Sequence, residues 1–362
     1  MDEGEKEMTE AGPEPANQMP VWVFRAKGVG GFNLLSGAAS HLNTTVKVVV
    51  IDQTGSTEYL AGIEAAAYAD ILAEVGKNEF RKFHPVIMVT GFDALKVALS
   101  IKARAGFKVI VVKFNRTRWS VKGVDIWVHT KQFLSFFWQT HGVLDLPFHD
   151  LTEKKFLAAT GNESGSWAQF PKPRIVALLG GKSKTLTWDM ATAISMVQQL
   201  KERAARNSAT LFISTSRRTG DAIASKLKEF EDSRTKIHLW HDKSSKNPFM
   251  DWLSMADLFV VTEDSISMLS ETYSTGKAIE VYRLLPKKSV RERILGFSLR
   301  EMFGLGRIVL VRELIEAGHF SEFSADAKVA PQSGKPGFRR LSNGQQAVVE
   351  KIMALRTINQ AH

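Results

Sequence analysis

The stretch VVTEDSISMLSETYSTGKAIEVYR, residues 260–283, decides the fold class of this 362-residue chain. It opens with a β-branched run, breaks at Thr262 and Glu263, continues as a helical pattern closed by Gly276, and ends in a second apolar run. A strand, a helix and another strand in this order form a βαβ unit, which joins parallel strands. The polar residues that follow the first strand therefore lie at the carboxyl edge of a sheet, where ligands bind in open α/β folds.

The same alternation extends over most of the chain. Short runs rich in Val and Ile alternate with helical stretches from Val21 to Val128, and a second alternation begins at Arg174. Strands that are almost continuously Val and Ile are buried on both faces, which is typical of a parallel sheet covered by helices. The sequence therefore predicts an α/β fold with two Rossmann-like, doubly wound domains.

A change of composition separates the two alternations. Residues 145–173 gather Pro, Gly and Ser and end in Pro-Lys-Pro, which resists both a helix and a central strand. We predict a disordered acidic tail at 1–19, a first α/β domain at 20–145, a linker at 146–173, a second α/β domain at 174–325, and a C-terminal tail at 326–362 with a final helix near residues 345–355.

The charge balance indicates the class of partner. The chain holds 48 Lys and Arg against 38 Asp and Glu, which gives a net charge of +10. The acidic first 19 residues have a net charge of −5, so the rest of the chain carries +15. This excess favours anionic partners. The chain has no cysteine, and no apolar run approaches the ~20 residues that span a bilayer. We expect a cytoplasmic protein whose membrane contact, if it has one, is peripheral.

Polar residues follow four strands of the second domain at the predicted carboxyl edge. Glycines let the backbone approach a phosphate, arginine offers a bidentate fork, and a serine-capped helix start adds a positive dipole. Ser267 and Glu271 share one helix face, where a carboxylate can accept hydrogen bonds from ribose hydroxyls. The predicted nucleotide-diphosphate site consists of Gly180, Gly181, Lys182, Ser183, Ser216, Arg217, Arg218, Asn247, Thr262, Asp264, Ser265, Ser267 and Glu271.

Each of these residues also has a purely structural interpretation. Ser265 can be an N-cap, Glu271 a solvated charge and Gly276 a C-cap. The GGKS segment lacks the full spacing of a phosphate-binding P-loop. It is the convergence of these residues on one edge of a sheet that favours a ligand site.

The residues of this region resemble a known family. Asn247-Pro248-Phe249, the stretch 260–271 and Ser274–Lys277, supported by LLGGKSK and STSRRT, are similar to the mitochondrial-fission ELM (elongated mitochondria) family, whose bacterial members are regarded as candidate GT-B glycosyltransferases. The resemblance implies two Rossmann-like domains facing a cleft, with a donor nucleotide held by the C-terminal one. It implies a nucleoside-diphosphate sugar as substrate, and no cofactor.

The first domain departs from the family pattern on its acceptor side. The family's Gly-x-x-Asn-Gln loop is represented by residues 30–34, with the Gln replaced, and its Gly-Arg-Asp/Gln segment is represented by residues 91–93, with the Arg replaced. Residues 129–132 stand where relatives have Pro-x-His-Asp. We assign Gly30, Gly31 and Asn33 to the acceptor-side loop, and name Asp93 and Asp52 as candidate general bases.

These features predict a metal-independent glycosyltransferase. Arg217, Arg218, backbone N–H groups near Gly181 and the helix start at Ser265 would neutralise the leaving diphosphate, while Glu271 would hold the ribose. The histidines show no paired metal-binding spacing, so we predict no metal.

The acceptor and the rival function depend on the first domain. Phe133, Phe136, Phe137 and Trp138 have the spacing of one helix face, which would meet a membrane or a lipid-linked acceptor if exposed and belongs to the core if buried; a saccharide is the other acceptor class. The alternative function is a non-catalytic adaptor that recruits partners at a membrane surface, as the plant members of the family are understood to do. The sequence has no motif for binding nucleic acid.

Overall fold

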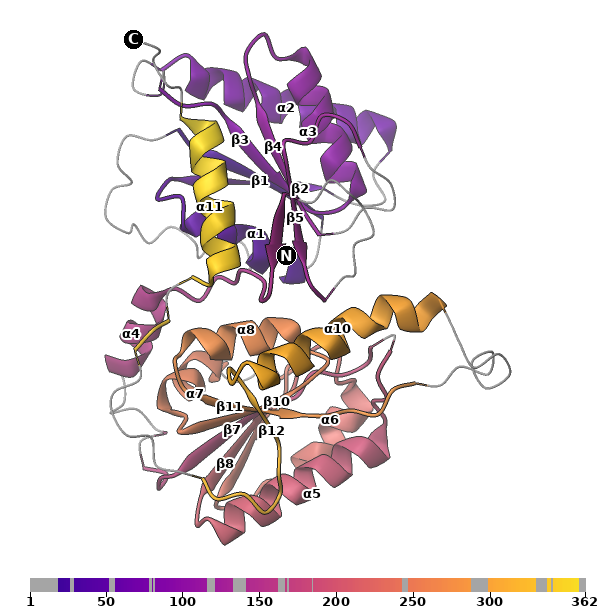
Figure 1. Cartoon of the computed structure of the whole chain (residues 1–362), viewed down its shortest axis with the longest axis vertical. Coiled ribbons are helices and arrows are strands. Elements are labelled where there is room, and N and C mark those ends of the chain that lie inside the picture. Colours follow the sequence, from indigo (N-terminus) through magenta and orange to yellow (C-terminus); the bar gives the residue numbers. More distant parts are fainter. Residues whose placement is uncertain are drawn as a thin grey trace.

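The structure is a computed structural model. It describes residues 19–26, 29–51, 56–77, 80, 82–115, 121–132, 141–161, 167, 169–183, 185–242, 247–287, 299–329, 337–339 and 341–357. Two parallel six-stranded sheets form its frame, one within residues 21–144 and the other within residues 174–322 (Figure 1). The sheets lie on either side of the predicted linker, while the domain boundaries themselves stay a prediction.

The first sheet has the strand order β2-β1-β3-β4-β5-β6. Its strands are β1 (Val21–Ala26), β2 (Val46–Ile51), β3 (Val86–Val89), β4 (Ile110–Phe114), β5 (Ile126–Thr130) and β6 (Gly142–Leu144). Helix α1 (Val29–Ser40) covers one face, and α2 (Thr57–Val75) and α3 (Phe92–Arg104) cover the other. This is a doubly wound sheet with a flavodoxin-like order.

The second sheet has the order β12-β11-β10-β7-β8-β9, which is the Rossmann order. Its strands are β7 (Arg174–Leu178), β8 (Thr210–Ser214), β9 (Thr235–His238), β10 (Leu258–Thr262), β11 (Ala278–Tyr282) and β12 (Ser321–Glu322). Helices α5 (Met190–Arg206) and α6 (Asp221–Lys228) cover one face. The other face is covered by α7 (Phe249–Met255), α8 (Ile266–Ser274) and α10 (Leu299–Glu316).

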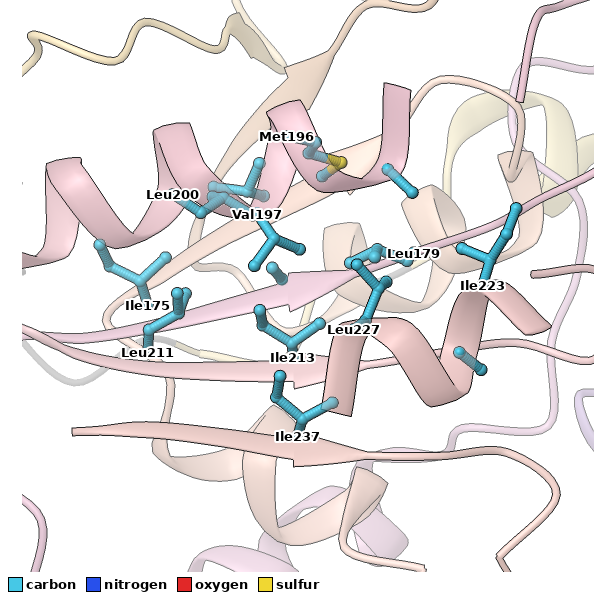
Figure 2. Packing of buried hydrophobic residues seen from close by; sticks show 14 of the residues in the cluster. Ile175, Leu179, Met196, Val197, Leu200, Leu211, Ile213, Ile223, Leu227 and Ile237 are labelled. Carbon is cyan, nitrogen blue, oxygen red and sulfur yellow. The ribbon is translucent and has the colours of Figure 1, made fainter. Parts of the chain in front are cut away.

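Alternation along each strand builds the two cores of this sheet. In β7, Ile175 belongs to the layer under α5 and α6, whereas its neighbour Val176 belongs to the layer under α7 and α8. Figure 2 shows the first layer, in which side chains of α5 and α6 meet those of β7, β8 and β9. Each fully buried Leu or Ile side chain stabilises the fold by about 1.5–3 kcal/mol, so both helix layers are held by their apolar faces.

The chain crosses between the two sheets twice. The first crossing contains α4 (Glu153–Gly161), a helix that the sequence analysis did not identify within the predicted linker. The second crossing leads to α11 (Asn343–Arg356), the expected final helix, which begins with a capping box between Ser342 and Gln345. Val348 and Ile352 of α11 pack into the core of the first domain, so the C-terminal helix completes the N-terminal half (Figure 1).

Helices α8 and α10 lie on the side of the second domain that faces the first (Figure 1). Ser270 in α8 donates a hydrogen bond to the carbonyl of Pro147 in the crossing segment, at 2.6 Å. Lys131, just after β5, lies 3.5 Å from the Glu313 carboxylate of α10. Helix α8, which carries the predicted ribose-binding residue Glu271, therefore lies at the junction of the two domains.

Candidate functional site

The winding of the second sheet changes direction between β7 and β10. These strands are neighbours, yet α5 after β7 covers one face and α8 after β10 covers the other. Such a switch point leaves a crevice beyond the carboxyl ends of the strands. Most of the predicted residues lie here, in three loops that we call the central loops: 180–183, 215–220 and 262–265.

The loop after β7 is bonded to the loop after β10. The Gly180 N–H donates to Thr262 Oγ1 at 2.8 Å, and the Gly181 N–H donates to Asp264 Oδ2 at 3.0 Å. The next amide, of Lys182, donates to a carbonyl of the loop after β8. These three N–H groups were expected to be free for a phosphate, and that expectation is wrong because protein oxygens already accept them.

The two glycines are required for close packing of the loops. A Cβ atom at Gly180 would lie 2.2 Å from Asp264 Oδ1, and one at Gly181 would lie 2.0 Å from the Arg218 carbonyl oxygen. Side-chain and backbone atoms do not approach so closely in well-packed proteins. The GGKS segment therefore owes its glycines to loop–loop contact in this structure.

The loop after β8 completes the contact. Ser216 Oγ and Thr219 Oγ1 each donate to the Gly180 carbonyl at 2.6 Å. One guanidinium nitrogen of Arg218 lies 2.9 Å from Asp264 Oδ2, and the Asp264 side chain is fully buried. Ser216, Arg218, Thr262 and Asp264 thus hold the three loops in one arrangement.

Positive charge remains at this edge after the internal pairs are made. Buried Glu263 pairs with Arg283 at 2.8 Å, just as Asp264 pairs with Arg218. Lys182 and Arg217 are exposed, and within the described part of the chain neither side chain forms an ion pair or hydrogen bond. In the central loops the two buried acids are neutralised by their arginine partners. Lys182 and Arg217 remain available to bind an anion.

The start of α8 adds a dipole to these charges. Ser265 occupies the N-cap position, but its side chain makes no capping hydrogen bond, contrary to the expected serine cap. Ser267, in the first turn, is exposed. The first N–H groups of a helix have no partner within it, and together they carry a partial positive charge. The edge beside Asp264 thus presents a helix start without a side-chain cap.

Two further predicted residues have local structural roles. Asn247 is exposed, and its Oδ1 accepts the Phe249 N–H at 3.0 Å where α7 begins. Ser183 Oγ accepts the Leu186 N–H at 2.9 Å. These bonds shape the loops that border the crevice and leave other atoms of both residues accessible.

Glu271 is half-buried on α8, one turn beyond Ser267. Burial raises the pKa of its carboxyl to about 8, and the charge of Asp150 in the crossing segment adds to the rise. No cation or hydrogen-bond donor of the described residues meets this carboxyl. Glu271 is therefore mostly protonated at neutral pH and can both donate and accept a hydrogen bond. Its neighbour Asp150 was not predicted, because only the fold brings the two together.

The acceptor-side candidates belong to the first domain. Gly30, Gly31 and Asn33 lie in the first turns of α1, and Asp93 lies in the first turn of α3, 3.6 Å from Lys96. None of the described contacts brings them to the central loops. Outside the described residues lie Asp52, the acidic tail up to residue 18, and the aromatic set Phe133, Phe136, Phe137 and Trp138.

The first domain also holds a basic group that the sequence analysis missed. Lys113 in β4 is 1% exposed, and its Nζ donates to the Phe114 carbonyl at 2.6 Å. Burial lowers the pKa of this amine to about 8. The sequence feature that could have identified Lys113 is the position of a lysine inside the apolar run of a central strand.

The described residues contain neither a metal-binding cluster nor a membrane-spanning helix. Among them, no group of three or more His, Asp or Glu side chains is arranged to hold a metal ion. None of the helices within those ranges combines the length and the apolar character needed to cross a bilayer.

Comparisons with known proteins agree with the resemblance seen in the sequence. The family model described as "Mitochondrial fission ELM1" matches residues 30–330. The mitochondrial fission protein ELM1 of Arabidopsis thaliana is 25% identical over 246 residues, covering 61% of this chain and 57% of that protein. The uncharacterized protein RP120 of Rickettsia prowazekii (strain Madrid E) is 32% identical over 106 residues, covering 29% of this chain and 30% of that protein. The matches thus span less than two thirds of either relative.

Solved structures with related architecture include two sugar-processing proteins. The UDP-GlcNAc 2-epimerase from Methanocaldococcus jannaschii is 10% identical with a TM-score of 0.45, covering 93% of this chain and 100% of its own. The family 9 glycosyl transferase from Veillonella parvula DSM 2008 is 10% identical with a TM-score of 0.44, covering 83% of this chain and 97% of its own. Both TM-scores are below 0.5, so the fold description above rests on strand order and packing alone.

Proposed function

Because this chain belongs to the mitochondrial fission ELM1 family, whose model matches residues 30–330, we propose that it binds a nucleoside-diphosphate sugar at the central loops and α8. We further propose that it transfers the sugar to an acceptor without a bound metal. The main support is that Arg217 and Lys182 stand without ion-pair partners among the described residues, in two loops that are bonded to Asp264 just before α8.

The diphosphate is the part of the ligand that this edge suits best. Two negative phosphates would meet Arg217, Lys182 and the positive end of α8, which together can replace the cation that many sugar-transfer enzymes use. Arg218 has a different role in this proposal. Its pairing with Asp264 fixes the loop that presents Arg217, so Arg218 is a positioning residue.

The ribose would lie along the face of α8 that carries Ser267 and Glu271. A carboxyl group whose pKa is about 8 can accept a hydroxyl hydrogen when ionised and donate one when protonated. The acceptor, saccharide or lipid-linked, would enter from the first domain, where Asp93 is the described candidate base. A peripheral attachment to a membrane belongs to the same proposal.

Thermal unfolding of the full chain with UDP-, GDP-, ADP- and CMP-sugars tests the donor site. A ligand at 100 times its dissociation constant stabilises the folded chain by about 2.7 kcal/mol. We expect one nucleotide to raise the melting temperature, and we expect the rise to be lost in Arg217→Ala and in Glu271→Ala. Matched controls are Arg234→Ala and Glu229→Ala, which remove exposed charges just before β9 and just after α6.

The controls decide how a negative result is interpreted. A rise that persists in both site variants, or that is lost equally in the controls, would refute the proposed site. No response to any nucleotide sugar would favour the non-catalytic adaptor that recruits partners at a membrane surface.

A further inference from the structure

A second cavity lies at the junction of the two domains, away from the central loops. Its volume is about 540 Å³. Its walls come from the end of α1, from residues 148–149 and 151–154 of the first crossing, from Ser274 at the last turn of α8, from residues 338, 339 and 341 of the second crossing, and from α11. We call it the hinge cavity. It meets α8 at the end opposite to the helix start beside Asp264.

One part of the inner surface of the hinge cavity is apolar, and polar side chains line the rest. Phe148, Leu151 and Val349 are each at least 90% buried, and Phe338 and Leu341 stand beside them. A cavity of 300–1,000 Å³ with an apolar lining and a few placed polar groups is the usual form of a small-molecule site. The apolar lining suits the hydrocarbon or aromatic body of a ligand.

Arg339 supplies a positioned cation on one wall. Its backbone N–H donates to the Ser274 carbonyl at 2.8 Å, and its guanidinium lies 4.3 Å from the centre of the Tyr273 ring. Among the described residues no carboxylate pairs with it. The guanidinium is therefore held in place by the ring, while its N–H groups stay available to an anion.

The other polar groups do not cancel this charge. Exposed Lys154 and Glu153 stand next to each other at the start of α4 and offset each other. His149 lies 2.7 Å from Ser274 through Nε2 and Oγ, and burial lowers the pKa of its ring to about 4, so it is neutral at pH 7. The amide of Gln345 is occupied by the carbonyls of residues 146 and 147. Among the described lining residues, Arg339 is left as the net charge of the cavity.

Close backbone contacts fix the cavity walls to both domains. A Cβ atom at Gly37 in α1 would lie 2.3 Å from the carbonyl oxygen of His149. One at Gly276, just after α8, would lie 2.4 Å from the carbonyl oxygen of Gly337. The walls are therefore seated against elements of each domain, so a molecule in the cavity touches both at once.

We propose that the hinge cavity is a binding site for a small amphipathic anion, with its apolar body between Phe148, Leu151 and Val349 and its carboxylate or phosphate on Arg339. Because both domains line the cavity, the bound ligand joins them and stabilises their packed arrangement. This proposal does not depend on nucleotide-sugar binding, since it uses different residues.

Isothermal titration of the full chain with octanoate and octyl phosphate tests the proposal, and the two ligands distinguish a carboxylate from a phosphate. 1-Octanol and octylammonium have the same hydrocarbon body without the negative charge. We expect saturable binding of one equivalent of an anion. Arg339→Gln should weaken it by about tenfold or more, as expected when a charge-assisted hydrogen bond is lost.

Arg104→Gln is the matched control, because Arg104 is likewise stacked over a tyrosine, Tyr68, at 5.0 Å but lies outside the cavity. It should leave binding unchanged. If Arg339→Gln fails to fold, Ser40→Trp at the exposed wall of the cavity should block the anion instead. Equal affinity for octanol and octanoate, or unchanged anion affinity in both cavity variants, would overturn the proposal.

Discussion

The two sheets of this protein are alike in size and winding but differ in how their carboxyl edges are built. In the second domain, buried Asp264 and Glu263 each neutralise an arginine, and two glycines let the loops approach each other closely. In the first domain, the described acid at the corresponding edge, Asp93, is part of a surface pair with Lys96. Buried carboxylates thus preorganise the described loops of the second edge, which supports the proposal that the donor binds there and the acceptor opposite.

The largest expected effect comes from removing the buried carboxylate of Asp264. Asp264→Asn leaves Arg218 and the Gly181 amide without their charged partner; breaking a fully buried pair costs about 3–5 kcal/mol, and we expect the low end of that range because the Arg218 side chain is 37% exposed. Asp93→Asn in the first domain breaks only an exposed pair and should cost about 0–1 kcal/mol. Urea unfolding of both variants measures the contrast.

The expected result is a large loss for Asp264→Asn, with nucleotide-sugar binding weakened because the loops move. Equal, small losses in both variants would mean that the central loops are no more organised than the edge of the first sheet.

Two glycines give the next test. Gly181→Ala places a Cβ 2.0 Å from a backbone oxygen, so the loops must separate, and we expect a loss of about 3 kcal/mol. Gly62→Ala, inside α2 of the first domain, meets nothing within 4 Å and should stabilise by about 0.5–1 kcal/mol. Thermal unfolding of the pair should therefore show shifts of opposite sign. A neutral Gly181→Ala would show that the loops can open without loss.

The elements that could be predicted from the sequence are those with a strong hydrophobic pattern. The long Val and Ile runs became central strands at the expected places, and the final helix was found. The strands β6 and β12, of 3 and 2 residues, are too short to show a period, and α4 lay in a segment rich in Pro and Gly. Pattern predicts an element only when the element is long enough to repeat it.

The candidate site was predictable in its location but not in the roles of its residues. Glycine, serine and arginine beyond strand ends have the same local chemistry whether they meet a phosphate or one another. Only the fold shows that Gly181 binds Asp264, while Arg217 and Lys182 have no ion-pair partner among the described residues. The rise in the pKa of Glu271 likewise depends on burial and on Asp150, which lies far away in the sequence.

The smallest expected effect is a difference in how two glutamates make stability depend on pH: Glu74 in the first domain and Glu271 in the second. Burial alone would raise the pKa of Glu74 in α2, but Lys47 and Lys77 bond to it and lower the pKa instead. Glu271 has no such partner among the described residues, and its pKa of about 8 exceeds the usual value near 4.5. Folded Glu271 therefore holds a proton that the unfolded chain has lost, so its contribution to stability falls as pH rises toward 8.

Glu271→Gln removes this titration, so its stability relative to the parent chain should rise by about 2 kcal/mol between pH 6 and pH 8. Glu74→Gln should instead destabilise by a constant amount over the same range, because a carboxyl with a lowered pKa stays ionised throughout it. Urea unfolding at several pH values measures both differences. Parallel pH profiles for the two variants would show that Glu271 is solvated like an ordinary surface acid, and the ribose-binding role would then lose its electrostatic basis.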